Sequence, residues 1–128
     1  SAAMKKVVDK GLKVKITELD VAVNNPYSGN WPGNKVTTFT EATAFAQKKR
    51  YCDIVKAYLD TVPVNLRDGI TVWGTTDKNT WLNDLFKSSN QYNGEKIAWP
   101  LLFDDNYNDK PALRGFADAL TGAACTNL

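Results

Sequence analysis

The chain has 128 residues, with 16 Lys and Arg against 14 Asp and Glu and a net charge of +2. This near balance gives no electrostatic reason to expect nucleic acid or an anionic membrane as a partner, and no run of about 18 apolar residues indicates a membrane span. The sequence contains no His, which excludes Ser-His-Asp and Cys-His catalysis and zinc sites that need imidazole. Any acid–base chemistry of this chain must therefore use carboxylates, Lys or Tyr.

The first part of the chain predicts a short helix, a strand and a long loop. Apolar residues recur on one helical face over residues 2–10, and Gly11 suits a helix end. Residues 12–20 alternate as a strand, and residues 24–37 (NNPYSGNWPGNKVT) are rich in the Pro, Gly and Asn typical of loops. Strict alternation puts five residues on one face of the strand: Leu12, Val14, Ile16, Glu18 and Asp20. It turns Lys13 and Lys15 to the other face, toward covering helices.

The middle of the chain predicts a long helix and a second strand. The helix is expected to begin near Thr38, because Thr38 and Glu41 have the spacing of a capping box. Apolar residues keep helical spacing from there to about Val62. Residues 69–73 are short, β-branched and nearly all apolar, as in a buried parallel strand.

The last third predicts a loop-rich segment over residues 75–110 and a final helix. Pro111 suits the first turn of that helix and Gly122 its end. The resulting order of helix, strand, helix, strand, helix predicts an α/β fold with parallel strands and right-handed crossovers. Because two buried parallel strands cannot form a stable sheet alone, the chain is expected to be part of a larger domain.

Two carboxylates and two tryptophans follow the predicted strands. Glu18 and Asp20 end the first strand, Trp73 ends the second, and Trp81 lies in the adjoining loop. In α/β folds, sites are built at the carboxyl ends of the strands, and carboxylates beside indole faces are typical of glycosidases. The alternative is that the carboxylates are solvated strand-end charges and that Trp73 belongs to the core.

Three segments occur in an order that is specific when they are taken together. Residues 15–21 read KITELDV, and residues 70–77 read ITVWGTTD. The third segment consists of residues 99–107, which read WPLLFDDNY, and residues 110–112, which read KPA. Together they resemble glycoside hydrolase family 10, the retaining endo-β-1,4-xylanases. The family fold is a (β/α)8 TIM barrel. The resemblance implies that residues 1–128 are the C-terminal portion of a single catalytic domain, from its sixth helix to its eighth helix, with two parallel strands.

The resemblance also implies roles for individual residues. Glu18 matches the nucleophile that forms a covalent glycosyl-enzyme during xylan hydrolysis. Asp20 matches the aspartate that orients a His on a strand which this chain lacks. Trp73 matches the indole beneath the −1 sugar, and Trp81 matches the one that covers the glycone subsites and disfavours glucose. Leu82 stands where many members carry Arg, so it is expected to reshape the contacts with the glycone.

The loop and the two cysteines leave alternatives open. Tyr27 is a candidate platform for the aglycone or a structural aromatic of the loop. Residues 24–37 contain no carboxylate, so we expect no calcium site there, and no other metal or cofactor is expected. The resemblance implies a secreted, extracellular protein, although the first residues show no signal peptide. In an oxidising compartment Cys52 and Cys125 pair; otherwise Cys52 is a small core residue and Cys125 a free thiol.

The expected ligand is xylan or a xylo-oligosaccharide. The family's acid/base Glu lies on a strand that this chain lacks, so activity is expected only with a complementary N-terminal fragment of the barrel. One alternative is a non-catalytic carbohydrate-binding module, which the strand–helix alternation disfavours because such modules are mostly β-sandwiches. Another is an inactive xylanase-like scaffold, which the presence of Glu18 disfavours. A designed or nicked fragment that reassembles with its complement is compatible with the resemblance.

Overall fold

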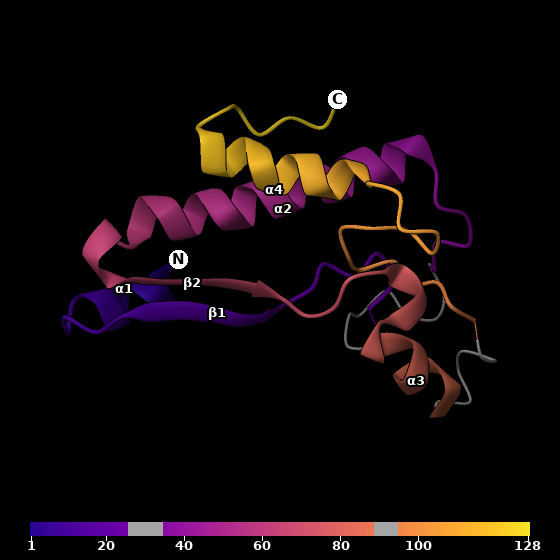
Figure 1. Cartoon of the computed structure of the whole chain (residues 1–128), viewed down its shortest axis with the longest axis horizontal. Coiled ribbons are helices and arrows are strands. Elements are labelled where there is room, and N and C mark those ends of the chain that lie inside the picture. Colours follow the sequence, from indigo (N-terminus) through magenta and orange to yellow (C-terminus); the bar gives the residue numbers. More distant parts are fainter. Residues whose placement is uncertain (26–34, 89–94) are drawn as a thin grey trace.

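The computed structural model describes residues 1–25, 35–88 and 95–128 (Figure 1). Its elements are α1 (Ala2–Val8), β1 (Val14–Leu19), α2 (Glu41–Thr61), β2 (Arg67–Val72), α3 (Trp81–Ser88) and α4 (Pro111–Thr121), with 3₁₀ turns at Val64–Leu66 and Asp77–Asn79. β1 and β2 pair in parallel, and α2 forms the crossover between them. The predicted α/β order and the parallel pairing are therefore confirmed. None of the described helices combines the length and apolar character needed to cross a lipid bilayer.

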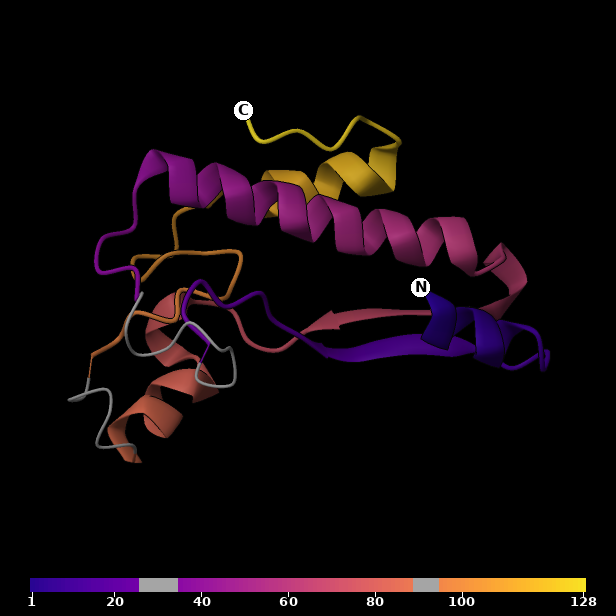
Figure 2. The same cartoon turned by 180° about the vertical axis from the view of Figure 1, so that it is seen from behind.

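The two long helices cover one side of the sheet. In both views α2 and α4 lie side by side on that side, and α3 lies beyond the carboxyl ends of the strands (Figures 1 and 2). Val14 of β1 packs against Tyr58 and Val62, while Ile70 of β2 joins the same cluster. These contacts leave the residues that alternate with Val14 and Ile70 on an open face of the sheet.

The strand alternation predicted for β1 is wrong at one point. Ile16 packs against the cluster that contains Tyr58 of α2, and Leu19 packs against the cluster that contains Tyr51 of the same helix. The two residues are three positions apart in β1, so strict alternation would put them on opposite faces. The pairing of β1 with β2 is irregular between Ile16 and Leu19, which accounts for the change of face. Glu18 therefore lies on the open face, opposite Ile16 rather than beside it. Lys15 is exposed and does not point toward covering helices.

Capping residues set the helix ends. α2 begins two residues later than predicted, because Thr40 rather than Thr38 is its N-cap and accepts a hydrogen bond from the backbone N–H of Thr43 at 3.2 Å. α4 begins at Pro111, as predicted, and ends at Gly122 with φ 80°, the left-handed conformation that glycine adopts without strain.

α2 and α4 approach each other closely at Gly115. A Cβ at this position would lie 2.1 Å from the carbonyl oxygen of Lys48, so the two helices can meet here only because the residue has no side chain. The segment after α4 is also held against α2. A disulfide links Cys52 to Cys125, and the buried ammonium of Lys48 donates to Thr126 Oγ1 at 3.1 Å. Of the two alternatives left open for the cysteines, the structure contains the disulfide.

Candidate active site

The carboxyl ends of the two strands bring a carboxylate and an indole together. The backbone N–H of Trp73 donates to the carbonyl of Leu19 at 2.8 Å, so the residue after β2 lies beside the end of β1. The Trp73 side chain is 45% exposed, and Glu18 is exposed on the open face of the sheet. Within the described parts of the chain, no hydrogen bond or ion pair occupies the Glu18 carboxylate. A strand-end carboxylate with unused lone pairs, next to an uncovered indole, is suited to contact a sugar ring.

Asp20 and Trp81 are joined directly. The indole Nε1 of Trp81 donates to Oδ2 of Asp20 at 2.8 Å, across 61 residues of sequence. Trp81 is the first residue of α3, and its side chain is 44% exposed. The structure therefore places four of the residues predicted for the site around the carboxyl ends of β1 and β2: Glu18, Asp20, Trp73 and Trp81.

One other predicted residue, Leu82, does not join this group. The Leu82 side chain is only 4% exposed and packs against Ala98, Ala22 and Ile97. Its place in α3 turns the side chain into this apolar cluster, and its effect on the glycone contacts stays a prediction. Tyr27 lies outside the described residues.

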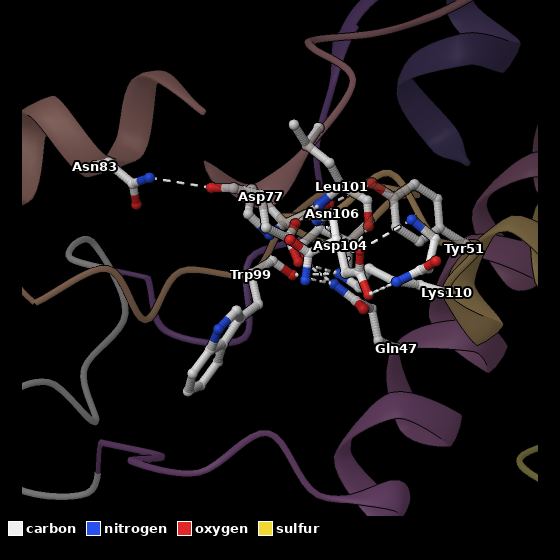
Figure 3. Close-up of polar contacts among 12 residues, drawn as sticks. Gln47, Tyr51, Asp77, Asn83, Trp99, Leu101, Asp104, Asn106 and Lys110 are labelled. Carbon is white, nitrogen blue, oxygen red and sulfur yellow. Dashed lines mark hydrogen bonds and ion pairs between the residues drawn. The ribbon is translucent and has the colours of Figure 1, made fainter. Parts of the chain in front are cut away.

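A buried ion pair behind the site was not predicted from the sequence. The ammonium of Lys110 lies 2.8 Å from Oδ2 of Asp77, and the two side chains are 4% and 5% exposed (Figure 3). Asp77 Oδ1 also accepts from the backbone N–H of Leu101 at 2.8 Å. Lys110 donates to the carbonyls of Leu101 at 2.7 Å and Trp99 at 3.0 Å. The pair thus ties residues 99–101 to the turn that precedes α3.

Two side chains of α2 hold the same segment from the other side. Gln47 donates through Nε2 to the carbonyls of Val21 at 2.9 Å and Trp99 at 2.5 Å. The hydroxyl of Tyr51 donates to the carbonyl of Pro100. Desolvation raises the pKa of Tyr51 above its ordinary value, with a further contribution from the charge of Asp20, so this hydroxyl stays a donor well into alkaline conditions.

Burial dominates the electrostatics of the ion pair. Desolvation raises the pKa of the Asp77 carboxyl, and the attraction of Lys110 opposes that shift. Desolvation likewise lowers the pKa of the Lys110 ammonium, and Asp77 opposes it. Each partner therefore favours the charged form of the other, against the desolvation that disfavours it. We interpret the pair as support for the site and not as reacting groups.

A cavity of about 380 Å³ lies at the ion pair, lined by Phe39, Asp77, Trp99, Lys110 and the acidic loop that follows residue 103, and neither Glu18 nor Trp73 lines it. Across residues 1–25, 35–88 and 95–128, no three His, Cys, Asp or Glu side chains are grouped so as to hold a metal ion.

Fold and site together define a class of protein. A parallel strand–helix–strand unit with a carboxylate and indoles at the carboxyl ends of its strands is typical of (β/α)8 barrels that cleave glycosidic bonds. The model of glycosyl hydrolase family 10 matches residues 1–119, and the chain belongs to this family. The two strands and their helices are accordingly part of the family's (β/α)8 barrel.

Curated relatives with high identity are xylanases. The chain is 72% identical over 127 residues to endo-beta-1,4-xylanase Xyn10C of Cellvibrio japonicus, covering 99% of this chain and 21% of that protein. It is 45% identical to endo-1,4-beta-xylanase A of Cellvibrio japonicus (strain Ueda107), covering 94% of this chain and 19% of that protein. The chain thus spans about a fifth of the length of these relatives.

Solved structures agree with this assignment. Native xylanase 10C of Cellvibrio japonicus superposes with a TM-score of 0.94 at 71% identity, over 99% of this chain and 26% of that chain. A mutant of the same xylanase in complex with xylopentaose superposes with a TM-score of 0.95, over 99% of this chain and 25% of that chain.

Proposed function

We propose that this chain is part of a retaining endo-β-1,4-xylanase and that it supplies the nucleophile, Glu18. The observation that carries the proposal is the position of Glu18 at the carboxyl end of a parallel strand, on the uncovered face, with Trp73 hydrogen-bonded to the next residue of that strand. Active sites of (β/α)8 barrels lie at this end of the strands.

In the proposed reaction a Glu18 carboxylate oxygen attacks the anomeric carbon of the xylose at the −1 position. The bond to the leaving sugar breaks while a second carboxylic acid protonates the leaving oxygen, and water then hydrolyses the glycosyl ester. In retaining enzymes the two carboxyl groups lie about 5–5.5 Å apart, so the acid must reach the open face close to Glu18. We propose that a complementary N-terminal part of the barrel supplies this acid.

The exposed indoles supply the sugar contacts. We propose that Trp73 supports the −1 sugar and that Trp81 lies over the glycone side, because both present almost half of their surface at the same edge of the sheet. The solved relative in complex with xylopentaose supports a xylo-oligosaccharide as ligand.

We further propose where the chain belongs in the complete barrel. Residues 1–128 correspond to the portion from the sixth to the eighth helix of one catalytic domain, and the open face of β1 and β2 becomes part of the barrel interior. The Cys52–Cys125 disulfide supports a secreted, extracellular protein, because disulfides persist in oxidising compartments.

The test uses a hybrid barrel, in which this chain replaces the segment that it matches in xylanase 10C of Cellvibrio japonicus. We expect the hybrid barrel to hydrolyse xylan and Glu18→Gln to lower its kcat by more than about a thousandfold, because the variant keeps the shape of the site but loses the nucleophile. Binding of xylo-oligosaccharides, followed by calorimetry, is expected to survive.

A matched control is Asp68→Asn, which removes an exposed carboxylate from β2 on the same sheet. This variant is expected to hydrolyse xylan like the unmodified hybrid barrel. Turnover by Glu18→Gln near that of the control would move the nucleophile elsewhere and contradict the proposal. Sugar binding without turnover in the unmodified hybrid barrel would instead favour the inactive scaffold.

A further inference from the structure

We propose that Asp20 is a positioning residue for Trp81, fixing the orientation of the indole that covers the glycone side of the site. The expected effect on sugar binding rests on the proposed function, whereas the contact between Asp20 and Trp81 does not depend on it. Oδ2 of Asp20 accepts from Nε1 of Trp81 at 2.8 Å, and this contact joins the end of β1 to the start of α3.

The indole of Trp81 is only partly covered. The residue is 44% exposed in this chain, so packing contacts surround only part of it. The terminal torsion of a Trp side chain is broad, which allows an exposed ring to swing. Nε1 is the one polar atom of the indole, and a bond from N–H to an ionised carboxylate is directional and stronger than a bond between neutral groups. This bond therefore selects one orientation among those that the torsion allows.

The backbone that carries Trp81 is, by contrast, well anchored. The next residue, Leu82, is buried at 4% exposure. Nδ2 of Asn83 donates to the carbonyls of Asp77 at 3.0 Å and Lys78 at 2.9 Å, which fixes the first turn of α3 to the preceding 3₁₀ turn. The first turn of α3 is thus held by several contacts, whereas the indole of Trp81 has its hydrogen bond with Asp20.

The consequence is an effect of Asp20 on sugar binding that is transmitted through Trp81. Removing the acceptor leaves the Trp81 ring present but free to change its orientation. Sugar binding then has to fix that orientation, which costs part of the binding free energy. Because a net hydrogen bond changes an equilibrium by about threefold to tenfold, and one to a charged group by more, we expect the affinity for xylotetraose to fall by at least about threefold. Asp20→Asn keeps an acceptor oxygen at the same position without the charge, and is expected to restore most of the affinity.

The first experiment observes the indole directly. In the ¹⁵N-labelled hybrid barrel, the Trp81 indole N–H signal is identified by its loss in Trp81→Phe. We expect Asp20→Ala to shift this signal upfield and to speed its exchange with water, Asp20→Asn to retain slow exchange, and the control Asp68→Ala to change neither. An unchanged Trp81 signal in Asp20→Ala would overturn the proposal.

The second experiment is a double-mutant cycle on binding, in the hybrid barrel that also carries Glu18→Gln so that no sugar is cleaved. If Asp20 acts through Trp81, xylotetraose binds no more weakly to Asp20→Ala/Trp81→Phe than to the weaker of the two single variants. Fully additive losses would overturn the proposal. A third outcome is that Asp20→Ala changes the Trp81 indole signal while the Glu18→Gln hybrid barrel itself does not bind xylotetraose. This outcome would count against the proposed function and would leave the positioning role of Asp20 in place.

Discussion

Replacing Lys110 by Met should strongly destabilise the segment behind the site. The two side chains of the Lys110–Asp77 pair are 4% and 5% exposed and lie 2.8 Å apart, so the change leaves a buried carboxylate without its cation. It also deprives the carbonyls of Trp99 and Leu101 of a donor. Removing one partner of a buried pair costs about 3–5 kcal/mol, which corresponds to a thermal midpoint roughly 5–10 °C lower for a barrel of more than about 250 residues.

The assay combines thermal unfolding of the hybrid barrel with hydrogen exchange at the amide of Leu101, which donates to Asp77. The variant for comparison is Asp77→Asn/Lys110→Met. It removes both charges, while the Asn side chain keeps an acceptor for the Leu101 amide. We expect the double variant to recover at least half of the stability lost by Lys110→Met. A loss below about 1 kcal/mol in Lys110→Met, or a double variant less stable than it, would refute the reasoning.

The destabilisation caused by Lys110→Met should also depend on pH. Burial already raises the pKa of Asp77 and the attraction of Lys110 opposes this, so removing the cation raises that pKa further. A carboxyl whose pKa is higher in the folded than in the unfolded state favours folding when it is protonated. The cost should therefore be largest at neutral pH and diminish as the pH falls through the raised pKa of Asp77.

Four further predictions follow from the rest of the structure. Reduction of the Cys52–Cys125 disulfide, which closes a separation of 73 residues, should lower the stability of the hybrid barrel by about 2–4 kcal/mol in thermal unfolding with and without reductant. Gly115→Ala should push α4 away from α2 and cost at least about 1–3 kcal/mol, whereas Ala117→Ser on the exposed side of α4 should be nearly neutral. Hydrogen bonds, the backbone N–H of Asn108 foremost, hold the pKa of Asp104 below its usual range, so their stabilisation is present above that range and lost as the pH falls through the lowered pKa. The protection of the Asn108 amide against exchange, relative to its intrinsic rate at the same pH, should then fall. The 128-residue chain alone should unfold without a sharp transition in near-UV circular dichroism, because one face of its sheet is uncovered, and a sharp, concentration-independent transition would contradict this.

The order of elements could be predicted from the sequence because each is marked by local chemistry. Pro111 and Gly122 bound the last helix at positions where their backbone preferences match the structure. Apolar spacing likewise identified the buried side of α2. The N-cap was misplaced by two residues because Thr38 and Thr40 both precede α2, and only the structure distinguishes which hydroxyl reaches a free N–H.

The features that were missed depend on contacts between distant segments. α3 lies inside a stretch predicted as loop-rich, and its eight residues are held by the long-range packing of Leu82 on Ala98. The change of face in β1 arises from its irregular pairing with β2, which alternation within one strand does not reveal. The pair of Asp77 and Lys110 spans two loops, so no local pattern connects them. The position of the four site residues near the carboxyl ends of the strands could be predicted because they lie at or after the ends of strands that the sequence marks clearly.

The most direct test of the central claim is to trap the covalent intermediate. A xylobioside with fluorine at C2 and a good leaving group should react with the hybrid barrel, forming an ester between the anomeric carbon and a carboxylate oxygen while the leaving group departs. Mass spectrometry of the digested protein is predicted to place the sugar on Glu18 and to find no label in Glu18→Gln. Label on another carboxylate, or hydrolysis of an unmodified xylo-oligosaccharide with inversion at the anomeric carbon, would contradict the account.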